Sequence, residues 1–90
     1  MQNFDAINLE SRQAVYQLLD LSKNELPKLL RGEVFTLSDL FIGYLWKRIP
    51  ARDRKLLGRN FLDFALSEEG TKTIAVMDKT AQNQQLYAKK

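Results

Sequence analysis

The sequence contains neither cysteine nor histidine. This excludes a disulfide framework, a thiol nucleophile, a metal site built on thiolate or imidazole, and a histidine-based triad. No apolar run approaches the roughly 18 residues of a membrane span. The first ten residues also lack the basic region followed by an apolar one that marks a signal peptide. These absences predict a cytoplasmic protein with no membrane partner.

Glycine is scarce, and the four glycines stand apart from one another. No segment therefore forms a glycine loop that could cradle a phosphate. Five candidate carboxylates are also scattered, and each has a capping or surface explanation: Asp39, Asp53, Asp63, Glu68 and Glu69. The sequence predicts a protein that is not an enzyme and that has no metal site and no cofactor.

The chain has 90 residues, of which 44% are hydrophobic. This length predicts a single domain, residues 1–90, with one modest core. The net charge is only +3, but residues 47–59 hold six basic side chains against one acidic side chain. Such segregation is typical of an anion-binding surface, and the alternative is an ordinary solvated helix face.

The beginning of the chain predicts an amphipathic helix from about residue 4 to residue 21. Its stripe of apolar and small residues consists of Phe4, Ile7, Ser11, Ala14, Val15 and Leu18. Residues 22–24 favour caps and turns, so they separate this N-terminal helix (residues 1–23) from the body (residues 24–90). A short helical piece from Asn24 to Leu30 follows. Gly32 fits the position after a helix end, where φ is often positive.

A short β-prone pair, Val34-Phe35, precedes a capping box that runs from Thr36 to Asp39. Apolar residues then recur at the spacing i, i+3, i+4, i+7, i+8, and they predict a helix to about Arg48. These residues are Leu37, Leu40, Phe41, Tyr44 and Leu45. Gly43 is the weak point of this helix.

Pro50 suits the first position of a second helix, which we expect to end near Glu69 with Gly70 as its stop. The buried side of this helix consists of Leu57, Phe61, Phe64 and Ala65, and the other side carries Arg52, Lys55, Arg59 and Asp63. The small Gly58 would let a crossing helix backbone approach. A β-hairpin is predicted next, with strands at residues 71–80 and 85–88 and a polar tip between them.

This order of helix, short strand, helix, helix and hairpin resembles the winged-helix domain, a helix-turn-helix with an attached β-hairpin. The resemblance covers roughly residues 24–90. It implies an α+β fold with three main helices, a short strand and a C-terminal β-hairpin, preceded here by an extended N-terminal helix.

The chain is also similar to a short uncharacterised bacterial family that occurs mainly in Gram-positive bacteria and their mobile elements. The shared pattern consists of Leu26-Pro27, Gly32, Phe35, Asp39-Leu40-Phe41, Trp46, Leu57-Gly58-Arg59 and Phe61. The family pattern usually has one residue between the proline and the glycine, whereas this chain has three more than that between Pro27 and Gly32. Its N-terminal helix is also longer. The family has no established activity, so this resemblance supports the predicted fold and adds little about function.

In winged helices the second helix of the helix-turn-helix usually enters the major groove, and the wing contacts the backbone or the minor groove. The resemblance therefore implies a reading helix from Ala51 to Leu66, a wing tip near Lys79 to Gln84, and double-stranded DNA as the partner. The protein would be a transcriptional regulator or a mobile-element accessory protein. The residues expected to contact DNA are Lys47, Arg48, Arg52, Arg54, Lys55, Arg59, Asn60, Lys79, Gln82 and Asn83.

Winged helices also serve as protein-binding modules. The alternative function is therefore an adaptor or dimerisation module, with a homodimer formed through the N-terminal helix. Trp46, Phe61 and Phe64 are expected to belong to the core, since aromatic residues at helical spacing are more often core than a base-stacking platform.

Overall fold

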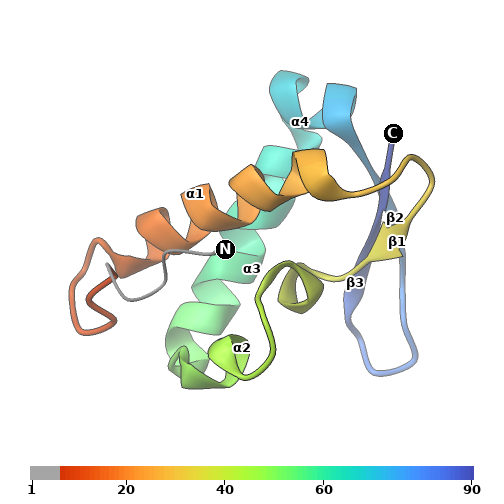
Figure 1. The fold of residues 1–90 in the computed structure, drawn as a ribbon. Coiled ribbons are helices and arrows are strands. Elements are labelled where there is room, and N and C mark those ends of the chain that lie inside the picture. Colours follow the sequence, from red (N-terminus) through yellow and green to blue (C-terminus); the bar gives the residue numbers. More distant parts are fainter. Residues whose placement is uncertain (1–6) are drawn as a thin grey trace.

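The computed structural model describes residues 7–90, which form an α+β fold of four α-helices, two short 3-10 helices and a three-stranded antiparallel sheet (Figure 1). In chain order the elements are α1 (Ala14–Glu25), η2 (Leu26–Lys28), β1 (Val34–Phe35), η3 (Leu37–Leu40), α2 (Leu45–Arg48), α3 (Ala51–Leu66), α4 (Glu68–Thr73), β2 (Ile74–Lys79) and β3 (Gln85–Lys89). The helices lie on one side of the sheet, and α1 packs across α3.

The strand order is β1-β3-β2, so the last strand in sequence lies in the middle of the sheet. Tyr87 of β3 pairs with Phe35 on one side and with Val76 on the other. Because side chains alternate along a strand, Phe35 and Tyr87 both face the helices, and both are buried. The predicted strand at residues 34–35 and the predicted hairpin are confirmed, although β2 begins only at Ile74.

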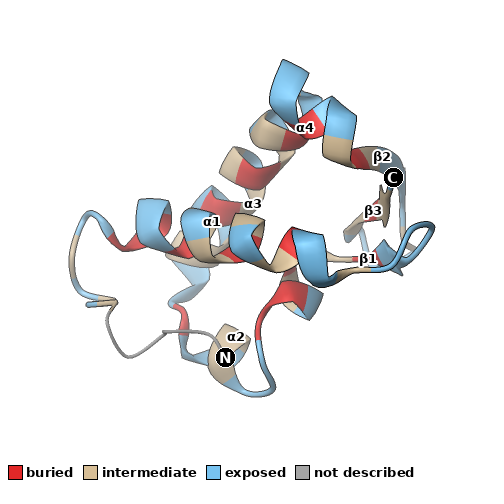
Figure 2. Ribbon diagram, turned by 45° about the horizontal axis from the view of Figure 1, so that its top comes forward, coloured by how far each residue is buried: buried red, intermediate tan, exposed pale blue. Residues whose placement is uncertain are grey.

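The core lies between α1, α3 and the inner face of the sheet, where buried residues gather (Figure 2). The fully buried Phe61 contacts Tyr87 edge to face, with ring centroids 5.0 Å apart. Its neighbour Phe64 is only partly buried, and the Lys23 ammonium lies 4.5 Å from its ring centroid. Burial of an aromatic or aliphatic side chain contributes about 1.5–3 kcal/mol. This packing fixes α3 and leaves its opposite side to solvent.

The N-terminal helix begins later and ends later than predicted. Phe4 lies outside the described residues, and residues 9–13 form turns and a bend, so α1 starts only at Ala14. The expected break at residues 22–24 is wrong because Ser22 is buried inside the helix, where its hydroxyl donates to the Leu19 carbonyl at 2.6 Å. A hydroxyl satisfied in this way is compatible with a helix interior. The short 3-10 helix η2 replaces the helical piece expected up to Leu30.

Two local features before α2 are confirmed. Gly32 adopts a φ of 89°, the left-handed conformation that glycine favours. The capping box is also present: the Thr36 side chain accepts from the Asp39 backbone, while the Thr36 N–H donates to the Asp39 carboxylate at 2.9 Å. Gly32 turns the chain before β1, and the capping box orients the chain as it leaves β1.

The predicted continuous helix over residues 37–48 is wrong. The 3-10 helix η3 ends at Leu40, Phe41 is extended (φ −111°, ψ 133°), and Gly43 has a φ of 50°. This break allows both Leu40 and Phe41 to be buried, whereas Tyr44 is exposed. The helical spacing of these apolar residues therefore arises from a compact turn followed by the single-turn helix α2.

The range Ala51–Leu66 expected for the reading helix matches α3, but the continuation to Glu69 is wrong. Ser67 is extended, and its hydroxyl accepts the Gly70 N–H at 3.1 Å, which caps the separate helix α4. Gly70 is thus not a stop. It is buried within α4 against the backbone of Phe64 and Ala65, and this contact requires the absence of a side chain.

Candidate nucleic-acid interface

The solvent side of α3 is basic over its first half. Arg52, Lys55 and Arg59 are exposed, and Asp63 follows them on the same side. The Arg52 side chain is 94% exposed, and its Nε lies 4.0 Å from the Asp53 carboxylate. An ion pair so exposed contributes little to stability. The guanidinium of Arg52 is therefore available for an external anion.

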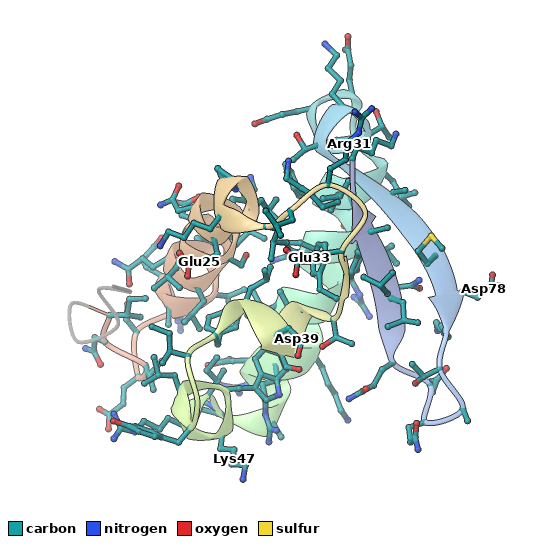
Figure 3. All side chains as sticks on the ribbon, turned by 45° about the vertical axis from the view of Figure 1, so that its right-hand side comes forward. Glu25, Arg31, Glu33, Asp39, Lys47 and Asp78 are labelled. Carbon is teal, nitrogen blue, oxygen red and sulfur yellow. The ribbon has the colours of Figure 1, made fainter. Side chains whose placement is uncertain are left out.

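The α2 helix adds two more cations beside the start of α3. Lys47 and Arg48 are both exposed, and Lys47 points away from the body of the protein (Figure 3). The Arg48 guanidinium lies 4.3 Å from the ring centroid of the exposed Tyr44. A cation–π contact of this kind orients the guanidinium without neutralising its charge.

The hairpin turn is held by hydrogen bonds to one residue. The Thr80 carbonyl accepts the Asn83 N–H at 2.9 Å, and the Thr80 hydroxyl accepts the Gln84 N–H at 3.1 Å. Asn83 has a φ of 65°, which asparagine tolerates better than most residues do. The turn presents Gln82 and Asn83 to solvent, and Lys79 is exposed at the end of β2.

A cleft of about 440 Å³ separates the first half of α3 from this hairpin. The α3 helix contributes Ala51, Arg54, Lys55 and Gly58 to its walls, and the hairpin contributes Asn83, Gln84, Gln85 and Tyr87. Trp46 and residues 36–38 complete the lining. The cleft therefore brings the basic helix, α2 and the hairpin turn around one opening.

Gly58 does not have the environment that its position suggested. We expected a helix backbone to pack against it, but no heavy atom in the described part of the chain lies within 4 Å of a Cβ built there. That expectation is wrong because Gly58 faces the open cleft. Its missing side chain enlarges the cleft and does not serve a close helix contact.

Two of the expected contact residues are not on the exposed side of α3. Arg54 and Asn60 are both half-buried. The Nε of Arg54 is fully buried and has no hydrogen-bond partner among residues 7–90. Leaving a buried donor unpaired costs about 1–3 kcal/mol. Arg54 thus lines the cleft with part of its side chain, while its buried Nε is unpaired within the described residues.

Sequence reasoning missed two aromatic residues that line the cleft, Trp46 and Tyr87. Trp46 was expected in the core. It does contact Phe41, with ring centroids 5.5 Å apart, but it is only half-buried and also lines the cleft. Tyr87 is 2% exposed, and burial raises the pKa of its hydroxyl to about 12. Only the pairing of β1 with β3 places it there, and no local pattern predicts that pairing.

Among residues 7–90, no acidic side chain lines the cleft. Asp39 is nearby in sequence, but its carboxylate is engaged by the Thr36 N–H. Within residues 7–90 no three acidic side chains approach closely enough to hold a metal ion together. None of the helices in that range has the length and apolarity needed to cross a membrane.

A family model described as Domain of unknown function (DUF1413) matches residues 22–89. The chain belongs to this family. The matched segment contains every residue of the Leu-Pro, Gly, Asp-Leu-Phe, Trp and Leu-Gly-Arg pattern, and it includes the cleft and the hairpin. The DUF1413 match thus covers the whole candidate interface and begins inside α1. No curated protein and no solved structure matches the chain.

Proposed function

We propose that this protein is a small winged-helix protein that binds double-stranded DNA, with α3 as the reading helix and the β2–β3 hairpin as the wing. The observation that best supports this proposal is that three elements with basic or polar side chains lie around the same cleft. Lys55 of α3, Trp46 of α2 and Asn83 of the hairpin turn line one cleft, and the exposed cations Arg52, Arg59, Lys47 and Arg48 belong to the same two helices.

The topology supports the winged-helix assignment. A helix, a short strand, two further helices and a hairpin follow in order, and the short strand pairs with the second strand of the hairpin. This pairing places the hairpin beside α3. A wing must lie in this position if it is to contact the same DNA duplex as the reading helix. The short α2 is the first helix of the proposed helix-turn-helix, and α4 is an addition between α3 and the wing.

Lysine and arginine on this surface would neutralise backbone phosphates, and each neutralised phosphate releases counterions. The side chains of Arg52 and Arg59 are long enough to form paired hydrogen bonds with guanine in the major groove. Gln82 and Asn83 on the turn are donors suited to the backbone or the minor groove. The role would be that of a regulator or a mobile-element accessory protein.

The test is fluorescence anisotropy with random duplex DNA over a series of salt concentrations. A triple variant with Arg52, Lys55 and Arg59 changed to alanine should bind much more weakly, and the slope of log K against log salt should shrink by about 0.9 for each lost phosphate contact. The matched control changes Arg12, Arg31 and Lys72 to alanine. It removes the same charge from exposed positions outside the proposed interface, and Arg31 lies at the opposite end of the molecule from Lys47 (Figure 3).

Binding by the control at nearly the wild-type level would support a local interface. Equal loss in the two triple variants would indicate attraction by net charge alone. The absence of salt-dependent binding by the wild-type protein would reject the DNA-binding proposal.

A protein-interaction role is the second candidate, and the outer face of the sheet favours it. Val34 pairs with Ala88, which pairs with Ala75, so an apolar row crosses all three strands on the face turned away from the helices. Val34 is 57% exposed. The N-terminal helix is a poorer dimerisation surface because its apolar side packs on α3 and its one large exposed hydrophobic residue is Tyr16. Light scattering of wild type and Val34→Lys would test a dimer through the sheet.

A further inference from the structure

The cleft between α3 and the hairpin has the properties of a small-molecule site. Its volume of about 440 Å³ falls in the range of about 300–1,000 Å³ that is usual for ligand pockets. We propose that it binds a planar aromatic carboxylate, with the carboxylate at Arg54 and Lys55 and the ring between Trp46, Gly58 and Tyr87. This site goes beyond the proposed DNA binding and requires no DNA.

The anion preference follows from the charges that line the cleft. Arg54 and Lys55 are both part of its wall, and no carboxylate faces them from the other lining elements. The buried Nε of Arg54 lacks a partner in the described residues. A guanidinium can donate two parallel hydrogen bonds to one carboxylate, so Arg54 can bind a carboxylate in the cleft through its terminal N–H groups.

The aromatic preference follows from the inner walls. Trp46 is held on one side by Phe41, and Tyr87 is held by Phe35 and Phe61, with ring centroids 5.7 Å and 5.0 Å away. Both rings are therefore fixed before a ligand arrives. Gly58 adds a stretch of helix backbone with open space above it. Fixed aromatic walls and a side-chain-free surface suit a flat, apolar ring system.

Tyr87 adds a hydroxyl-bearing side chain to the residues that line the cleft. Tyr87 is almost fully buried, and burial raises the pKa of its hydroxyl. Ser38 and Gln85 also line the cleft and can donate hydrogen bonds to a ligand. A ligand with a ring substituent that accepts hydrogen bonds would use these groups for orientation.

The probe is 1-naphthoate, and its uncharged counterpart is 1-naphthamide. The chain has a single tryptophan, so the indole N–H resonance of Trp46 in a proton–nitrogen NMR spectrum is unique and reports on the cleft. We expect saturable shifts of this resonance with 1-naphthoate and about tenfold weaker binding of the amide, because the charge-assisted hydrogen bonds are lost. Calorimetry supplies the affinities.

Gly58→Leu is the decisive variant. Its side chain should occupy the cleft without touching the core, so 1-naphthoate affinity should fall by about tenfold or more while the thermal midpoint stays equal or rises. Gly58→Ala should give a smaller loss of 1-naphthoate affinity, and this variant takes the place of Gly58→Leu in the test if the leucine variant folds poorly. Arg54→Met should abolish the preference for the carboxylate over the amide, whereas the matched change Arg59→Met, outside the cleft, should leave it intact.

Three results would overturn the proposal. They are no saturable shift of the Trp46 resonance, unchanged affinity in a folded Gly58→Leu protein, and equal binding of carboxylate and amide. The measurements use the protein alone, so a failure to bind DNA would not affect them.

Discussion

The first half of α3 borders open space, whereas the second half is enclosed by α1, α4 and the sheet. Two glycines mark the contrast. A Cβ at Gly58 would meet nothing within 4 Å among the described residues, but a Cβ at Gly70 would collide with the Phe64 carbonyl and lie 2.8 Å from the Ala65 Cα. One helix thus anchors the fold with its apolar second half and presents its basic first half to other molecules.

The largest expected effect is at the enclosed half. Phe61→Ala removes a fully buried ring that contacts Tyr87, so the free energy of unfolding should fall by about 3–5 kcal/mol. Leu56→Ala, on the exposed side of the same helix, is the control. This variant should change the free energy of unfolding by no more than about 0.5 kcal/mol. Urea unfolding measures both. Similar values for the two variants would remove the distinction between the sides of α3.

Gly70→Ala should destabilise the protein by about 1–3 kcal/mol, although alanine is the better helix former. The added methyl group meets backbone atoms of Phe64 and Ala65, which cannot move without shifting α3. Thermal unfolding by circular dichroism suffices as the measurement. A neutral or stabilising result would show that the contact between α4 and α3 is loose.

Tyr87 lies at the boundary between the two halves, and its buried hydroxyl predicts a loss of stability at high pH. The pKa is raised from 10.0 to about 12 in the folded protein, so the unfolded state loses the proton first. The tyrosine's contribution is fully present below pH 10 and is lost as the pH rises toward 12. Tyr87→Phe should therefore unfold with a weaker pH dependence than wild type in this window. Parallel pH profiles would contradict the burial of the hydroxyl.

The smallest effect is expected at the open half, and it has the opposite sign. Gly58→Ala should stabilise the protein by about 1 kcal/mol, because alanine has the higher helix propensity and the new methyl group meets no neighbour. Comparison with Gly70→Ala in the same buffer gives the sharpest contrast. Destabilisation at both positions would mean that the cleft is closed in solution.

The parts of the fold that depend on local chemistry were predictable from the sequence. Gly32 adopts its positive φ, the capping box forms between Thr36 and Asp39, and Pro50 precedes a helix with the expected bounds Ala51–Leu66. The α4 helix also had a local signal, a serine followed by two glutamates, which suits a helix N-terminus. Gly70 also fits the position after a helix end, and this second signal favours one helix up to Glu69 over two separate helices.

The parts that depend on tertiary packing were not predictable in the same way. The apolar spacing at Leu40, Phe41 and Tyr44 fits one helix, but the left-handed Gly43 redirects the chain. The basic surface could be anticipated from the charges of residues 47–59. The cleft could not, because it requires β3 to bring Tyr87 beside Gly58, and this pairing of distant segments leaves no trace in local periodicity.

The central position of β3 has a kinetic consequence. Both β1 and β2 form their strand hydrogen bonds only with β3, which is synthesised after every other element described here. Closing the long loop between Phe35 and Tyr87 is entropically costly and therefore slow, whereas the hairpin and the turns of α3 form from nearby residues. On the ribosome, the helices would thus emerge with no sheet to cover Phe61. Folding of the whole domain should then proceed in one late, cooperative step when the last strand docks.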